Sequence, residues 1–194
     1  MALSPGGKYV ATSDANGELR LRDMSESHLI GSLKPGKLPL AAFSADGASF
    51  VAAGKDGSAV RVRLAGGREV NRFELKAEGP SALALSQDGR SLAVALADQT
   101  IRLYDEKARE VRAIRDRAGA SALAFSPDGK RLVCAGRDRT VRLYDVETGD
   151  EVLALREHGG PVTGVAFSPD GKRLAASSMR EVFVWSAGRA FPAR

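Results

Sequence analysis

The chain is poor in the residue types from which catalytic and metal sites are usually built. Its 194 residues include one cysteine and two histidines, and aromatic residues make up only 6%. One cysteine cannot form an internal disulfide, and with so few histidines it cannot complete a zinc site. No stretch approaches the roughly 20 consecutive apolar residues of a membrane helix. No charged segment followed by an apolar run opens the chain, as a secretory signal would. We therefore expect no membrane span, no cofactor and a cytoplasmic location.

Charge of one sign is not concentrated anywhere in the sequence. The 29 basic and 24 acidic residues give a net charge of +5, but the two signs alternate along the whole chain. A basic stripe interleaved with aromatic residues, typical of nucleic-acid binding, is absent, so this pattern disfavours nucleic acid as a partner. Arginine outnumbers lysine by 21 to 8, which is typical of a high-GC bacterial genome.

A six-residue motif occurs five times at nearly constant spacing. Residues 125–130 read Phe-Ser-Pro-Asp-Gly-Lys, and residues 167–172 repeat the same letters. Weaker copies begin at residues 3, 43 and 85, so the five starts are 40, 42, 40 and 42 residues apart. Spacing this even predicts five structural repeats of about 41 residues each.

A second motif keeps the same period. Residues 101–105 (Ile-Arg-Leu-Tyr-Asp) match residues 141–145 (Val-Arg-Leu-Tyr-Asp), and each copy follows the first motif by about 16 residues. Looser copies lie at residues 19–23, 60–63 and 182–185. Two motifs that recur with the same period and a constant separation are strong evidence for a structural repeat.

Each repeat is predicted to contain four short strands joined by hairpin turns. Helical periodicity is absent, and turn residues recur every 8 to 12 positions. In the first turn of the fourth repeat, Pro127 presets φ, Asp128 follows, and Gly129 can adopt the left-handed conformation. Asp138 occupies the second turn. The fifth repeat carries the same first turn in Pro169, Asp170 and Gly171. In the fourth repeat the four strands are predicted at residues 121–126, 131–136, 140–146 and 151–156.

These motifs resemble the WD-repeat β-propeller family over essentially the whole chain. The best matches are residues 125–145 and 158–185. The resemblance implies an all-β propeller of four-stranded antiparallel blades, with about five blades and an incomplete first and last blade. We expect one domain over residues 1–194, with blades at approximately 1–36, 37–77, 78–118, 119–159 and 160–194.

The family stiffens a blade with a buried, hydrogen-bonded group of His, Ser or Thr, a turn Asp and Trp. Here only the fifth repeat holds His158 and Trp185 together, with Ser177 or Ser178 as the hydroxyl, and its turn Asp is missing. The other repeats place Tyr104, Tyr144, Arg22 and Arg63 at the Trp position. No repeat completes the group, so packing between blades is expected to supply most of the stability.

The two ends of the repeat array are incomplete in different ways. The first repeat lacks nearly all of its first strand, and residues 188–194 are too short to supply a fourth strand to the last repeat, which predicts 18 strands. Three arrangements remain open. The chain is a piece of a longer polypeptide, it closes as a five-bladed ring, or it dimerises through its open faces. We favour the first.

The sequence offers no catalytic constellation, so we expect no enzyme activity. Cys134 lies among apolar strand residues without a basic partner, which favours a buried structural role. The expected function is a non-catalytic protein-interaction scaffold with a protein or peptide partner. The alternative is a sensor or targeting segment of a larger multidomain signalling protein, for example fused to a kinase-like domain, with catalysis outside this chain. The resemblance implies docking on the face that holds Lys55, Asp56, Lys76, Asp98, Arg115, Arg117, Arg137, Arg139, Glu157, His158 and Arg180.

Overall fold

The chain folds into five small antiparallel sheets that follow one another in sequence. The computed structural model describes residues 2–14, 16, 18–25, 28–33, 40–54, 57–64, 68–74 and 79–186. These residues form nineteen strands and no helix. Within these ranges, therefore, no helix is long and apolar enough to cross a membrane.

Within each sheet the strands are hydrogen-bonded in sequence order, as in a meander. The first sheet contains β1 (Ala2–Leu3), β2 (Tyr9–Ser13), β3 (Leu19–Asp23) and β4 (His28–Leu33). The second contains β5 (Leu40–Phe43), β6 (Ser49–Ala53), β7 (Ser58–Arg63) and β8 (Arg68–Glu74). The third contains β9 (Ala82–Leu85), β10 (Leu92–Ala95), β11 (Thr100–Tyr104) and β12 (Glu110–Arg115). The fourth contains β13 (Ala120–Phe125), β14 (Arg131–Gly136), β15 (Val141–Asp145) and β16 (Glu151–Leu155). The fifth contains β17 (Val162–Phe167), β18 (Arg173–Ser178) and β19 (Val182–Ser186).

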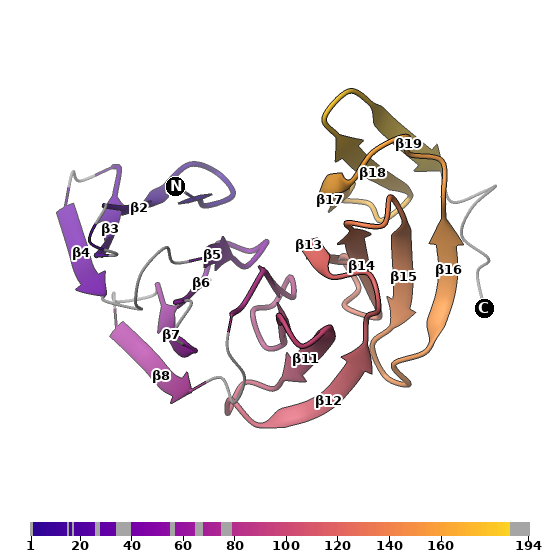
Figure 1. Cartoon of the computed structure of the whole chain (residues 1–194). Helices are drawn as coiled ribbons and strands as arrows, with labels where there is room; N and C mark the ends of the chain where they lie inside the picture. Colours follow the sequence, from indigo (N-terminus) through magenta and orange to yellow (C-terminus); the bar gives the residue numbers. More distant parts are fainter. Residues whose placement is uncertain are drawn as a thin grey trace.

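The five sheets are arranged around an arc (Figure 1). The first strands lie on the inside, where β1 packs against β5, β5 against β9, β9 against β13 and β13 against β17. Figure 1 shows the first sheet and the fifth sheet separated by the opening of the arc. This architecture confirms the predicted all-β class of short antiparallel blades arranged as a partial propeller.

Two details of the prediction were wrong. The first repeat does have an inner strand, because β1 pairs with β2 through Ala2 and Leu3, so the described chain has nineteen strands rather than 18. At the family's Trp position in the second repeat, Val62 pairs with Phe50, as Tyr104 pairs with Leu92 in the third. Arg63 therefore lies one residue beyond that position. Residues 188–194 lie outside the described residues.

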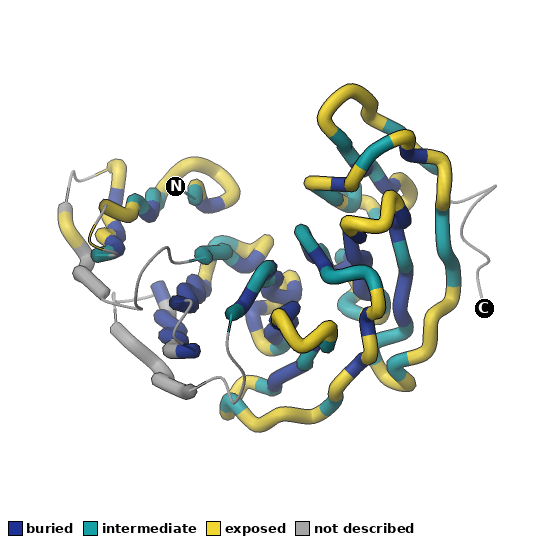
Figure 2. Tube along the Cα trace, viewed as in Figure 1, coloured by how far each residue is buried: buried dark blue, intermediate teal, exposed yellow. Residues whose placement is uncertain are grey.

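Hydrophobic packing occurs between sheets rather than within them. We call the face that a sheet turns to the next sheet its forward face, and the opposite side its back face. In the third sheet, Ile101 and Leu103 lie on the forward face and pack with Leu132 and Tyr144 on the back face of the fourth. Figure 2 shows the buried residues concentrated in the middle of the arc and exposed residues along its outer strands. The interfaces between sheets thus form the core.

The turn between the first two strands satisfies its own polar groups. In the fourth sheet the Ser126 hydroxyl accepts a hydrogen bond from the Arg131 backbone N–H at 2.9 Å and donates to Asp128 at 2.6 Å. Gly129 has a φ of 70° and donates its N–H to the Ser126 carbonyl. The same three hydrogen bonds recur in the second, third and fifth sheets. The sequence predicted the roles of Asp and Gly in this turn but missed the role of Ser.

This turn generates a test of packing between neighbouring sheets. Gly89 and Gly129 occupy equivalent turns with φ of 65° and 70°. A Cβ on Gly129 would meet nothing within 4 Å, whereas one on Gly89 would lie 2.9 Å from the Ser49 Cβ of β6. We expect Gly129→Ala to lower the free energy of unfolding by about 1 kcal/mol through left-handed strain alone. Gly89→Ala should cost at least about 1 kcal/mol more because of the clash. Urea denaturation of both variants measures the difference, and equal costs would contradict it.

Candidate functional site

The surface where docking was predicted is formed by two kinds of connection. We call it the loop face: it holds the loops from each fourth strand to the next sheet and the turns between second and third strands. Of the eleven candidate residues, Lys55, Asp56 and Lys76 lie outside the described residues. The other eight are distributed over the third, fourth and fifth sheets.

Arg117 and Arg137 are brought together at one cavity of the loop face. Arg117 belongs to the loop between β12 and β13, and Arg137 to the turn between β14 and β15. Both line a cavity of about 580 Å³, together with Gln99 from the turn between β10 and β11. The remaining lining residues are mostly small or aliphatic and include no aromatic residue. Two guanidinium groups at the edge of such a cavity can bind an anionic group.

Arg139 and His158 line a second, neighbouring cavity of about 400 Å³. The other lining residues include Asp138, Arg142 and Arg156. Arg139 has a φ of 70°, an uncommon conformation for a residue other than glycine. His158 is buried, so it forms the floor of this cavity rather than an exposed contact. The two cavities together place the fourth sheet at the centre of the site.

Arginines of the third strands and arginines of the loop face differ in their partners. On the third strands, Arg142 of β15 pairs with Asp138 and Glu151, and Arg102 of β11 pairs with Asp98 and Glu110. The hydrogen bonds that Arg142 donates to Asp138, and the negative charge of Asp138, raise the pKa of Arg142 despite burial. Six arginines of the loop face form no ion pair with any described residue: Arg115, Arg117, Arg137, Arg139, Arg156 and Arg180.

Two acidic candidates are engaged within the molecule. Asp98 accepts hydrogen bonds from the Thr100 backbone N–H at 3.0 Å and from Arg102 at 3.1 Å. Burial alone would raise the pKa of Asp98, but these hydrogen bonds lower it below its ordinary value. Glu157 accepts a hydrogen bond from the Trp185 indole at 3.2 Å. Both acidic candidates are therefore engaged by other side chains, whereas six arginines among the described residues of the loop face have no ion pair.

His158 and Trp185 pack together at the fifth sheet, where the sequence analysis expected an incomplete hydrogen-bonded group. The imidazole meets the Phe183 ring edge-on at a centroid distance of 4.8 Å and the Trp185 ring at 6.0 Å. Neither imidazole nitrogen has a hydrogen-bond partner among the described residues. The Glu181 carboxylate lies 3.9 Å from Nδ1. Ring packing, rather than hydrogen bonding, therefore holds the imidazole of His158 in place.

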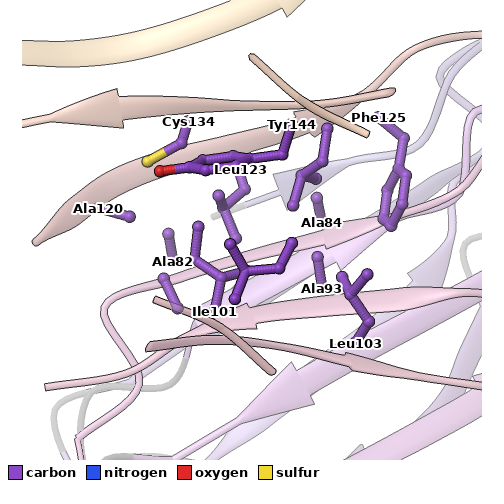
Figure 3. Close-up of a cluster of buried hydrophobic side chains, with 13 residues drawn as sticks. Ala82, Ala84, Ala93, Ile101, Leu103, Ala120, Leu123, Phe125, Cys134 and Tyr144 are labelled. Carbon is purple, nitrogen blue, oxygen red and sulfur yellow. The ribbon is translucent and has the colours of Figure 1, made fainter. Parts of the chain in front are cut away.

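A buried polar group that the sequence analysis missed joins Asp116 to two side chains of the fourth sheet. The Tyr144 hydroxyl lies 3.4 Å from one carboxylate oxygen of Asp116, and the Cys134 thiol lies 3.7 Å from the other. Figure 3 shows the Tyr144 oxygen beside the Cys134 sulfur in the core between the third and fourth sheets. Burial first, and the Asp116 charge second, raise the pKa of both Tyr144 and Cys134. These raised pKa values favour a neutral thiol and phenol, which can donate hydrogen bonds.

The repeat itself contains the signal for this group. Asp116 precedes His158 by 42 residues, so it occupies the histidine position of the fourth repeat. Cys134 is paired with Arg142 in the fourth sheet, and Ala176 is paired with Phe183 in the fifth. Cys134 and Ala176 therefore occupy equivalent positions in the two repeats. A search limited to histidine at that position overlooks a carboxylate, which here lies within reach of the Tyr144 hydroxyl and the Cys134 thiol.

The face opposite the loop face carries a more apolar cavity of about 490 Å³. The inner strands supply Phe43, Leu85, Phe125 and Phe167, and the turns supply Pro127 and Pro169. No cluster of three or more His, Cys, Asp or Glu residues within the described ranges could hold a metal ion.

Five consecutive antiparallel blades packed face to face define a β-propeller protein. The sequence profile described as YNCE-like beta-propeller matches residues 28–180, which is most of the chain. The chain therefore belongs to the YNCE-like β-propeller family. A comparison with curated protein sequences finds no significant match.

The buried group gives a prediction that a double-mutant cycle can check. Asp116→Ala leaves the Tyr144 hydroxyl and the Cys134 thiol buried without their acceptor. We expect it to lower the free energy of unfolding by about 1–3 kcal/mol. Tyr144→Phe should cost less in the Asp116→Ala background than in the parent, because its hydrogen bond is already lost. Identical costs of Tyr144→Phe in both backgrounds, measured by urea denaturation, would show that the two groups do not interact.

Proposed function

We propose that this propeller is a non-catalytic scaffold of the WD-repeat type, whose loop face docks a protein or peptide partner. The observation that carries the proposal is the set of six loop-face arginines without an ion pair among the described residues. Charged side chains that serve the fold, such as Arg142, are paired in this chain. Unpaired guanidinium groups beside two cavities supply binding capacity that the fold does not use.

The chemistry of the first cavity favours an acidic segment of the partner. Arg117 and Arg137 come from different connections but line the same cavity. A guanidinium group binds a carboxylate through two parallel hydrogen bonds, which fixes direction as well as charge. Gln99 adds an amide that can donate or accept. A peptide with Asp or Glu side chains matches this set of donors.

Two observations support this choice over catalysis or nucleic-acid binding. Cys134 is buried and its pKa is raised, so the thiolate needed of a nucleophile is disfavoured. The cavity of Arg117 and Arg137 has no aromatic lining residue on which a base could stack.

The proposal is tested with a fluorescein-labelled octaglutamate peptide, whose binding is followed by fluorescence anisotropy at low salt. Arg117→Gln and Arg137→Gln should each weaken binding about tenfold, as expected when one charge-assisted hydrogen-bonded pair is lost. The matched control is Arg109→Gln. Arg109 is exposed on the opposite face, in the turn between β11 and β12, where it pairs with Asp105. This control should bind as the parent does.

Three outcomes would overturn the proposal. The first is that octaglutamate does not bind, and the second is that Arg109→Gln weakens binding as much as the loop-face variants do. The third is tighter binding of a single-stranded oligodeoxythymidine that the same two variants abolish, with a steep salt dependence. That result would reassign the surface to nucleic acid.

A further inference from the structure

The cavity of about 400 Å³ on the loop face takes no part in the proposed docking of an acidic peptide. Its lining residues are Asp138, Arg139, Thr140, Arg142, Arg156 and His158. Arg142 is paired with Asp138. Arg139 and Arg156 are exposed, and neither forms an ion pair with any described residue. Two guanidinium groups of this cavity are therefore available to an anion.

His158 forms the floor of the cavity and has no hydrogen-bond partner among the described residues. The residue is only 5% exposed, and both imidazole nitrogens are buried without a partner. Buried polar atoms are nearly always hydrogen-bonded, and leaving one without a partner costs free energy. The Glu181 carboxylate, 3.9 Å from Nδ1, already accepts a hydrogen bond from the Gly159 backbone N–H at 2.9 Å. An unpartnered imidazole beside two unpaired guanidinium groups favours a ligand that carries several acceptor oxygens.

The preceding repeat shows that the fold does not require these basic groups. Gln99 and Arg139 occupy the same turn position, with left-handed φ values of 63° and 70°. Asp116 takes the position of His158, and each is buried beside the aromatic residue of the following sheet. The third repeat thus has an amide and a carboxylate where the fourth has a guanidinium and an imidazole. The carboxylate has donors within the protein, whereas the basic pair has no acceptor among the described residues.

We propose that this cavity binds a phosphoryl group, either as inorganic phosphate or as a phosphate monoester. A phosphoryl group carries a charge of about −1.5 to −2 at pH 7 and presents at least three acceptor oxygens. Arg139 and Arg156 come from different connections, and each can donate paired hydrogen bonds to it. A single carboxylate would satisfy one guanidinium group and leave the other unpaired. Because both arginines are exposed, their side chains can close on the anion and hold it against the imidazole of His158.

Trp185 provides the first readout, because it is the chain's only tryptophan and its ring centroid lies 6.0 Å from that of His158. Its fluorescence should change saturably when inorganic phosphate is added at constant ionic strength, with a Kd of about 1 mM. Arg139→Gln and Arg156→Gln should each weaken binding about tenfold. The matched control is Arg115→Gln, because Arg115 takes the position of Arg156 in the third sheet and is also exposed. This control should bind phosphate as the parent does.

A second measurement uses the parent chain and does not depend on any variant folding. The chain has two histidines, His158 and His28 of the first sheet, so NMR spectra contain two sets of imidazole signals. Inorganic phosphate should shift the signals of His158 and leave those of His28 unchanged. Acetate at the same ionic strength should bind at least about tenfold more weakly, because it is a monoanion with two oxygens.

The source of the phosphoryl group is distinguished by comparing inorganic phosphate with N-acetyl-phosphoserine methylamide. Tighter binding of the phosphoserine derivative assigns the cavity to a phosphorylated side chain, and tighter binding of inorganic phosphate assigns it to the free ion. A parent chain that shows no saturable response to either ligand overturns the proposal. So does acetate that binds as tightly as phosphate, or an effect of Arg115→Gln equal to those of Arg139→Gln and Arg156→Gln.

Discussion

A four-stranded sheet with two apolar faces cannot stand alone in water, and this constraint organises the whole chain. In the first four sheets the forward face carries residues such as Leu19, Val51, Ile101 and Val141, most of them aliphatic. The back faces of the following sheets present larger groups, including Phe50, Tyr104 and Tyr144. Because each pair of faces buries apolar area of this kind, the order of the sheets in space follows their order in sequence. The loop face and the open end of the arc are both consequences of this stacking.

The sequence predicts this fold well wherever a motif reports on backbone geometry. The Ser-Pro-Asp-Gly turn requires a left-handed glycine, and strands predicted from it in the fourth repeat match β13–β16 to within one or two residues. The prediction failed in the second repeat, where valine and arginine alternate along Val60-Arg61-Val62-Arg63. This alternation fits the motif equally well when it is shifted by one residue, so only the pairing with Phe50 shows that Val62 takes the aromatic position. It also failed at β1, since two residues are too few to show a period.

The candidate site was less predictable, because charge on a loop does not reveal its partner. Topology alone places Asp98 and Arg137 on the same face, but Asp98 is held by Arg102 while Arg137 lines a cavity. These different interactions depend on which side chains lie close together in space, and the spacing of residues along the sequence does not determine that. Asp116 was missed for another reason: it takes a position where the family's pattern expects histidine, and its function depends on the burial of Tyr144 and Cys134.

The turn built on Ser126 has a consequence for how this protein can change during evolution. Its hydroxyl, carboxylate and glycine satisfy one another within six residues, so its own hydrogen bonds are local. Each repeat therefore carries its own means of closing the first hairpin. Duplication or loss of a repeat transfers that hairpin intact, and the connections at the other end of the blade are left free to diversify under selection for different ligands.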